Sequence, residues 1–298
     1  MLISNLTLSQ AITQQLGQQQ SNIADLEMQL SSGKSLNMPS DNPTAVTQVL
    51  QLSGQAAQII GWQSNASTAT SWLGMANNAA NSALNDMQSA RTSLLQALNQ
   101  ATQSPTQYQA LATQLQGINQ TLLATANTQY GGRAMFAGTS AVTQAYDASG
   151  NYMGNGDTPT VVIGAGAGPG QTTPISVPGT TLFGTGAANV FTTLSTVIGQ
   201  LSGGAPTSAQ LNAALTALDA NIATASQGAA TLGVASQQAS AAGAALTTQL
   251  QGVQTSQSGL ESVNIATVTS QLSSQLTNYQ AALWAASKAI PETLDHFL

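Results

Sequence analysis

The residues with the most reactive side chains gather near the end of the chain. His296 is the only histidine, and Glu292 and Asp295 lie close to it. A zinc site needs three or four nitrogen, sulfur or oxygen ligands, and the chain has no second histidine and no cysteine. A catalytic triad needs a rigid surround, which the third-last position of a chain supplies poorly. These residues predict the polar face of a last helical turn, with no metal and no cofactor.

Two internal segments also offer little chemistry. The glycine-rich run 164–170 lacks the spacing and the Lys-Ser/Thr pair of a phosphate-binding loop, so it predicts a surface loop. Residues 137–188 contribute only Asp147, Asp157 and hydroxyl groups, which is weak material for a hydrolase. The tryptophans stand at helical spacing, which favours packing in a core or between subunits over ligand binding. They are Trp62, Trp72 and Trp284. The chain is therefore not expected to be an enzyme.

Charge is unusually sparse in these 298 residues. There are four basic and ten acidic residues, giving a net charge of −6, and only 5% of residues are charged. So few cations exclude a nucleic-acid binder that relies on basic clusters. The absence of cysteine excludes a disulfide framework. No membrane-spanning run and no cleaved secretion signal are expected.

Hydrophobic periodicity predicts long helices in the middle of the chain. From Leu211 to Leu260, positions step 4-3-4-3 over about seven heptads, and this seam needs a partner helix. Residues 46–103 predict that partner. Ser104-Pro105 is typical of a helix start, and Gly131-Gly132 is expected to end that helix. Pro206-Thr207-Ser208 predicts where the long helix begins.

Between residues 137 and 188 the periodicity changes. Glycine, proline, asparagine and aspartate cluster there, and short β-branched runs predict strands at Thr160–Ile163 and Pro174–Val177. This segment is interpreted as a small β-rich insertion between helices.

Both ends of the chain carry a narrow apolar stripe at helical spacing. Two paired helices bury little core for their length, so we expect neighbouring molecules in a polymer to cover these stripes. The predicted assembly seam is Ile12, Leu16, Ile23, Leu26, Leu30, Val268, Leu272, Leu276, Tyr279 and Leu283. A patch without periodicity follows the first stripe and predicts a connector to the inner helices. Its key residues are Gly33, Pro39, Asp41 and Pro43.

The predicted fold is mainly α with a β-rich insertion, built from elongated, folded-back coiled-coil helices. The terminal helices pair, the long inner helices pair, and a small β domain lies outermost. The predicted domains are a terminal helical domain (1–32 and 265–298), a helical rod with connectors (33–136 and 189–264) and a β-rich outer domain (137–188).

Several segments have the character of a known family. Leu30–Pro43 resembles the N-terminal signature of the bacterial flagellin superfamily, and Leu260–Leu298 is similar to its C-terminal signature. Arg133–Thr139, Ser176–Phe183 and the final Leu-Asp-His-Phe-Leu resemble the hook-associated branch of that superfamily. Asn42 departs from the pattern, because an acidic residue is usual there.

This resemblance implies a structural component of the bacterial flagellum, an adaptor at the hook–filament junction on which the filament assembles. The implied partners are further copies of the chain in a ring, another hook-associated protein on the hook side and flagellin on the filament side. An export chaperone and the flagellar type III apparatus would deliver it outside the cell without a cleaved signal peptide. No nucleic-acid or membrane partner is expected. Two alternatives stay open: the filament subunit flagellin, and a secreted helical adhesin or effector.

Overall fold

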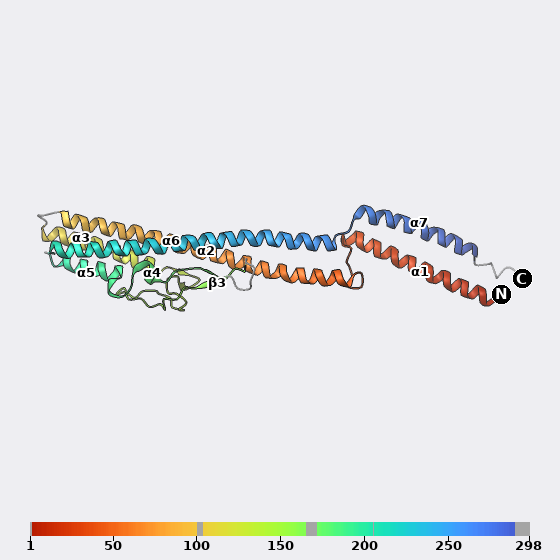
Figure 1. Ribbon diagram of the computed structural model, residues 1–298, viewed down its shortest axis with the longest axis horizontal. Helices are drawn as coiled ribbons and strands as arrows, with labels where there is room; N and C mark the ends of the chain where they lie inside the picture. The colour runs from red at the N-terminus through yellow and green to blue at the C-terminus, as the bar shows by residue number, and fades with distance from the viewer. Residues whose placement is uncertain (1, 100–103, 165–171, 205, 290–298) are drawn as a thin grey trace. The chain divides into compact units, whose positions relative to one another are not determined.

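The computed structural model describes residues 2–99, 104–164, 172–204 and 206–289 (Figure 1). The chain divides into two compact units, residues 1–58 with 250–298 and residues 59–249. Both divisions fall inside long helices, and the three-domain scheme expected from the sequence stays a prediction. Among the described residues, none of the helices combines the length and the apolar character that crossing a bilayer requires.

The first unit contains the two terminal helices. α1 (Leu2–Ser32) packs along α7 (Ile265–Ala289), so the expected pairing of the terminal helices is confirmed. The free ends of both helices lie at the same end of the pair in Figure 1. The unit also holds the start of α2 (Pro43–Asn99) and the end of α6 (Ser208–Glu261). The part of the predicted terminal helix beyond Ala289 lies outside the described residues.

Short-range polar contacts fix where the inner helices begin. Thr207 and Gln210 cap α6 reciprocally: the Thr207 N–H donates to Gln210 Oε1 at 2.9 Å, and the Gln210 N–H donates to Thr207 Oγ1 at 3.2 Å. α3 (Pro105–Ala126) starts as the sequence predicts, with the Ser104 N–H donating to Gln107 Oε1 at 2.9 Å.

Small and branched side chains alternate in the helical core of the second unit. α2, α3, α5 (Val190–Ser202) and α6 all contribute to this core. Alanines make up much of the buried face of α2, and because they are small, the neighbouring helices can approach closely. The larger fully buried side chains are Leu73, Met87, Leu94, Leu115, Leu122 and Leu194.

Aromatic packing replaces sheet as the main support of residues 137–188. Tyr146 lies within 4.8–5.6 Å, between ring centroids, of Tyr152, Phe183 and Phe191. The segment also holds α4 (Gly179–Phe183), the 3-10 turn Gly186–Ala188 and a two-stranded antiparallel sheet. The expected β-rich insertion is thus a small β part within largely irregular chain.

The strands differ in detail from the expected ones. In the antiparallel pair, β3 (Thr160–Val162) ends one residue before the predicted strand does. β4 (Thr172–Pro174) shares only Pro174 with the strand predicted at Pro174–Val177, and residues 175–177 are not in a strand. A second hairpin joins β1 (Gln129–Tyr130) to β2 (Arg133–Ala134). Its turn is Gly131-Gly132, with φ values of +58° and +80°. These glycines therefore form a two-residue hairpin turn, and the helix they were expected to end stops earlier, at Ala126.

Candidate assembly site

The connector begins where α1 ends. Gly33 has a φ of +68°, in the left-handed region that favours glycine, and this turns the chain out of the helix. The Gly33 N–H donates to the Gln29 carbonyl at 2.9 Å, and its own carbonyl accepts from the Val263 N–H at 3.2 Å. The predicted connector residue Gly33 therefore ties the end of α1 to the segment between α6 and α7.

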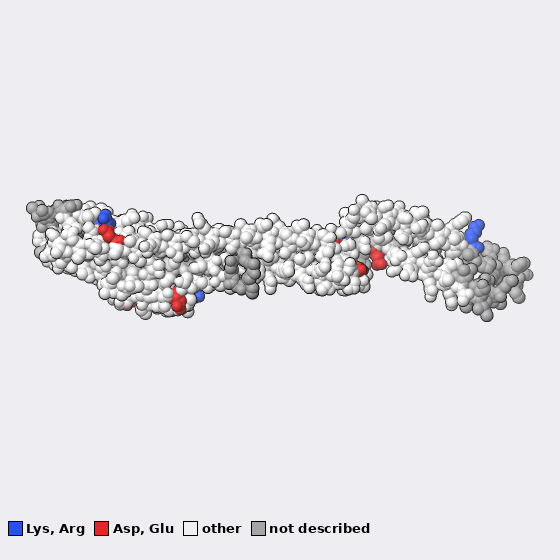
Figure 2. Space-filling view, viewed as in Figure 1, with Lys and Arg blue, Asp and Glu red and all other residues white. Residues whose placement is uncertain are grey.

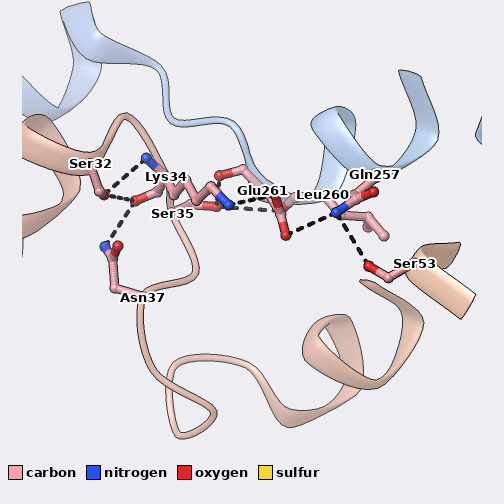
Figure 3. A network of polar contacts seen from close by, with 8 residues as sticks. All are labelled: Ser32, Lys34, Ser35, Asn37, Ser53, Gln257, Leu260 and Glu261. Atoms are coloured by element: carbon pink, nitrogen blue, oxygen red, sulfur yellow. Dashed lines mark hydrogen bonds and ion pairs between the residues drawn. The ribbon is translucent and has the colours of Figure 1, made fainter. Parts of the chain in front are cut away.

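Residues 33–35 and 261–263 form a two-sided contact, which we name the clamp. Lys34 and Ser262 pair as an antiparallel bridge, and the Ser35 N–H donates to the Glu261 carbonyl at 2.6 Å. The Lys34 ammonium lies 3.1 Å from Glu261 Oε2 (Figure 3). The clamp thus joins segments more than two hundred residues apart, and it fixes how α1 and α7 leave the connector.

Side chains around the clamp satisfy most of its remaining polar groups. Ser35 Oγ donates to the Leu260 and Glu261 carbonyls at 3.3 and 3.1 Å. Gln257 Nε2 lies 3.5 Å from both Glu261 Oε1 and Ser53 Oγ, so α2 also reaches this network (Figure 3). The hydrophobic periodicity gave no indication of Lys34 or Glu261. Their charge could have marked them as candidates, because charged residues are rare in this chain.

Asp41 and Asn42 have different roles in the second half of the connector: one closes a turn and the other caps a helix. Asp41 Oδ2 accepts the N–H groups of Asn37 and Met38 at 2.9 and 2.8 Å, which closes a turn that contains Pro39. Asn42 Oδ1 accepts the Ala45 N–H at 3.0 Å and caps α2, with Pro43 as its first residue. Asn42, the departure from the family pattern, therefore keeps a capping oxygen without the charge.

The predicted seam is only half covered in a single chain. Ile23 and Val268 are buried, and Leu276 and Leu283 are exposed, by 39% and 43%. The other seam residues are partly buried: Ile12, Leu16, Leu26, Leu30, Leu272 and Tyr279. The structure therefore brings most of the predicted seam together between α1 and α7, but it leaves two leucines of α7 uncovered.

Small and polar residues complete the covered stripe of α7. The sheltered positions step 4-3-4-3-4 through Val268, Leu272, Gln275, Tyr279, Ala282 and Ala286. Periodicity of large apolar residues favoured Leu276 and Leu283 instead, since it gives weight to size rather than to the direction of the partner helix. The stripe that faces α1 is consequently narrower and less apolar than predicted.

The face of the described residues that Figure 2 shows is nearly uncharged. No group of three or more histidine or acidic residues in the described ranges could hold a metal ion. The predicted polar turn around His296 lies outside these ranges, as do all but the first residue of the glycine-rich run 164–170. Chemistry at the surface is therefore dominated by amides, hydroxyls and isolated apolar side chains.

The two acids of the outer segment organise turns. Asp147 Oδ1 accepts the Ser149 and Asn151 N–H groups, both at 2.8 Å. Hydrogen bonds from the side chain and backbone of Asn151 lower the pKa of Asp147. Asp157 Oδ2 accepts from Thr139 Oγ1 at 3.2 Å and from Asn155 Nδ2 at 2.8 Å. Both carboxylates are thus engaged as hydrogen-bond acceptors within their own loops.

The tryptophans have different environments. Trp72 packs against Tyr130 with the two rings tilted by 40° and their centroids 4.8 Å apart, as expected for a packing residue. Trp62 is partly buried and lies against the backbone at Gly164. Trp284 on α7 is 70% exposed. Its predicted role as a contact between subunits stays a prediction.

Comparison with known proteins points to flagellar hook proteins. Residues 3–141 match the family described as bacterial flagellin N-terminal helical region. Over 154 residues the chain is 32% identical to flagellar hook-associated protein 3 of Salmonella typhimurium. That match covers 51% of this chain and less than half, 45%, of the length of the curated relative.

Solved structures share the fold at low sequence identity. A Vibrio parahaemolyticus structure assigned to a flagellar hook-associated protein is 21% identical, with a TM-score of 0.68, and the match covers 74% of this chain and all of that one. Flagellar hook-associated protein 3 of Legionella pneumophila is 15% identical, with a TM-score of 0.61, and the shares are 71% and 98%. Bacillus cereus FlgL is 18% identical, with a TM-score of 0.59, and the match covers 70% of this chain and 99% of that one.

These matches confirm the resemblance and the mainly helical fold class predicted from the sequence. Residues 3–141, just under half of the chain, therefore match the bacterial flagellin N-terminal helical region, and the described residues have the fold of flagellar hook-associated proteins.

Proposed function

We propose that this chain is a structural component of the bacterial flagellum, an adaptor at the hook–filament junction on which the filament assembles. The observation that carries the proposal is the half-covered terminal pair. Ile23 and Val268 are buried in a single chain, whereas Leu276 and Leu283 remain exposed. A lattice of copies would cover them. The identity to a hook-associated protein supports the same conclusion.

The connector supports a role in a lattice. A subunit must present its terminal helices to its neighbours in one orientation, and the clamp fixes the exits of α1 and α7 through backbone hydrogen bonds. Backbone hydrogen bonds keep their direction when side chains repack. The clamp therefore suits a subunit that contacts different proteins on its hook side and on its filament side. We propose further copies in a ring, another hook-associated protein and flagellin as those neighbours.

The proposed role needs no catalysis. The acids of the outer segment are occupied in turns, and the curated relative is named flagellar hook-associated protein 3. We also propose that the chain reaches the outside of the cell through the flagellar type III apparatus, without a cleaved signal peptide, with an export chaperone bound beforehand.

Flagellin itself is the second candidate, because residues 3–141 match a region named after it. Labelling the chain on intact flagella separates the two functions. An adaptor gives one spot at the hook end of each filament. Label along the whole filament would refute the adaptor function and support the filament subunit, and label absent from flagella would refute both functions.

A further inference from the structure

We propose that two outward-facing pairs of side chains, at opposite ends of the α1–α7 pair, join neighbouring copies of this chain head to tail. The first pair is Asp25 with Met28 on α1, and the second is Trp284 with Lys288 on α7. This inference rests on the proposed function, since it specifies which surfaces of the terminal helices touch in the polymer.

The pair on α7 combines an exposed aromatic ring with a positive charge. Trp284 is 70% exposed, more than any other large apolar side chain of the described residues. Lys288 lies one helical turn further along the same face, with its ammonium 5.5 Å from the centre of the Trp284 ring. Together they present one apolar and one basic group to the surroundings.

The pair on α1 is the acidic counterpart. Met28 is 43% exposed, and Asp25 lies three residues before it, on the same side of the helix. Glu27 adds a second negative charge to this end. Within the described ranges, Asp25 and Glu27 form no ion pair.

The two pairs cannot meet within one chain. α1 and α7 leave the clamp side by side, so positions can be compared by their distance from it (Figure 1). At 1.5 Å per residue, Met28 and Trp284 are separated by about 22 Å along the helices, and Asp25 and Lys288 by about 24 Å. In Figure 2 the basic group lies at the far end of α7 and acidic groups lie near the clamp.

One shift of a second copy satisfies both pairs. In each pair the apolar residue is nearer to the clamp and the charged residue is further from it. A parallel copy moved by about 23 Å along the helix axis therefore places its Met28 beside Trp284 and its Asp25 beside Lys288. Sulfur–aromatic contact and opposite charges both favour this register.

The molecule that binds each pair is a second copy of this chain, because the two surfaces differ and complement each other. Such a heterologous contact leaves one unused surface at each end, and because each step advances along the helix axis, it continues into a helical array of copies. Buried apolar area supplies the affinity, and the two charges select the register among otherwise similar polar faces.

A charge swap tests the contact in cells. D25K and K288E each place like charges in the interface, so each variant expressed alone should reduce labelled chain on flagella by about tenfold or more. Expressed together, the two variants should restore most of it, because copies that alternate pair opposite charges at every contact. The contacts then have the exchanged signs and the native signs in turn. Q18K, on the same outer side of α1 but out of register, is the matched control and should incorporate normally.

The outcomes separate this inference from the proposed function. Normal incorporation of each single variant, or a mixture as poor as its components, overturns the contact while the wild-type chain still labels the hook end. Wild-type chain missing from the hook end overturns the adaptor function itself.

Cross-linking gives a second readout, because the chain has no cysteine of its own. Disulfides need Cα atoms within about 7 Å, which excludes a bond between positions 28 and 284 of one chain. On oxidised flagella, M28C/W284C should produce a ladder of covalent multimers, and the out-of-register Q18C/W284C should not. If M28C/W284C assembles into flagella but gives no ladder, the proposed contact is contradicted. If this variant does not assemble, the charge-swap experiment tests the contact instead.

Discussion

Single buried hydroxyls set the stability of the aromatic cluster. Tyr152 donates to the Phe136 carbonyl at 2.9 Å, whereas the fully buried Tyr146 hydroxyl has no hydrogen-bond partner among the described residues. Y152F should therefore lower the free energy of unfolding by about 1 kcal/mol, and Y146F should leave it unchanged or raise it. Denaturant unfolding of both variants checks this, and an equal loss in both would contradict the assigned hydrogen bonding.

Burial also makes this cluster sensitive to alkali. Burial raises the pKa of Tyr146 far above its usual value, so the folded state keeps the proton that the unfolded chain releases. The resulting stability is fully present below the usual tyrosine pKa of about 10 and is lost as the pH rises above it. Unfolding curves from pH 8 to 11 should show this decline, and Y146F should flatten it. An identical decline in Y146F would assign it to other groups.

Two glycines of the first unit should respond oppositely to alanine. Gly33 has a φ of +68°, so G33A should weaken the clamp by about 1–2 kcal/mol, although no atom blocks a Cβ there. Gly17 lies inside α1 with open space around it, and G17A should stabilise the helix by about 0.5–1 kcal/mol. Thermal unfolding monitored by circular dichroism distinguishes the two. Equal effects would mean that the clamp does not hold α1.

We expect assembly to depend on the covered stripe of α7, because it holds the terminal helices together. L272D places a charge against α1 and should cost about 1–3 kcal/mol in the terminal pair while residues 59–249 stay folded. The expected result is loss of the chain from flagella and of motility. N278D, an isosteric change at an exposed position of α7, is the control. Normal motility with L272D would exclude this stripe from the assembly seam.

Element positions were more predictable than element orientations. Heptad spacing and the Ser104-Pro105 and Thr207 signals located the starts of α3 and α6, because capping is a local property. The face of α7 was assigned less well: Leu276 and Leu283 belong to the apolar period but point away from α1. Periodicity defines a stripe about a helix axis, and only the partner helix decides which edge of it is covered.

The clamp was harder to predict from the sequence than the faces of the helices. Glycine and proline marked residues 33–43 as a connector, but nothing local indicated that Ser35 would donate to Glu261, since the two are distant in the chain. Asp41 was predicted only as a connector residue; in the structure it closes a turn, while the cap of α2 comes from its neighbour Asn42. Non-local pairing is decided by the fold as a whole.

At the scale of the whole molecule, burial is unequal between the two units. Large apolar side chains such as Leu73, Leu94 and Leu122 are fully buried in residues 59–249, whereas most of the predicted terminal seam is only partly buried. Stability in a protein follows such differences locally, because weakly packed elements open independently of the core. We therefore expect α1 and α7 to open more readily than the helices of the second unit.

Amide hydrogen exchange measures this difference directly. In dilute monomer, residues 5–30 and 268–295 should exchange at least about a hundredfold faster than the buried parts of α2 and α6, which corresponds to about 3 kcal/mol less protection. In isolated flagella the same segments should become protected, because neighbouring copies then cover Leu276 and Leu283. Strong protection of both terminal segments in the monomer would show that the pair is stable alone, and assembly would then need a different driving surface.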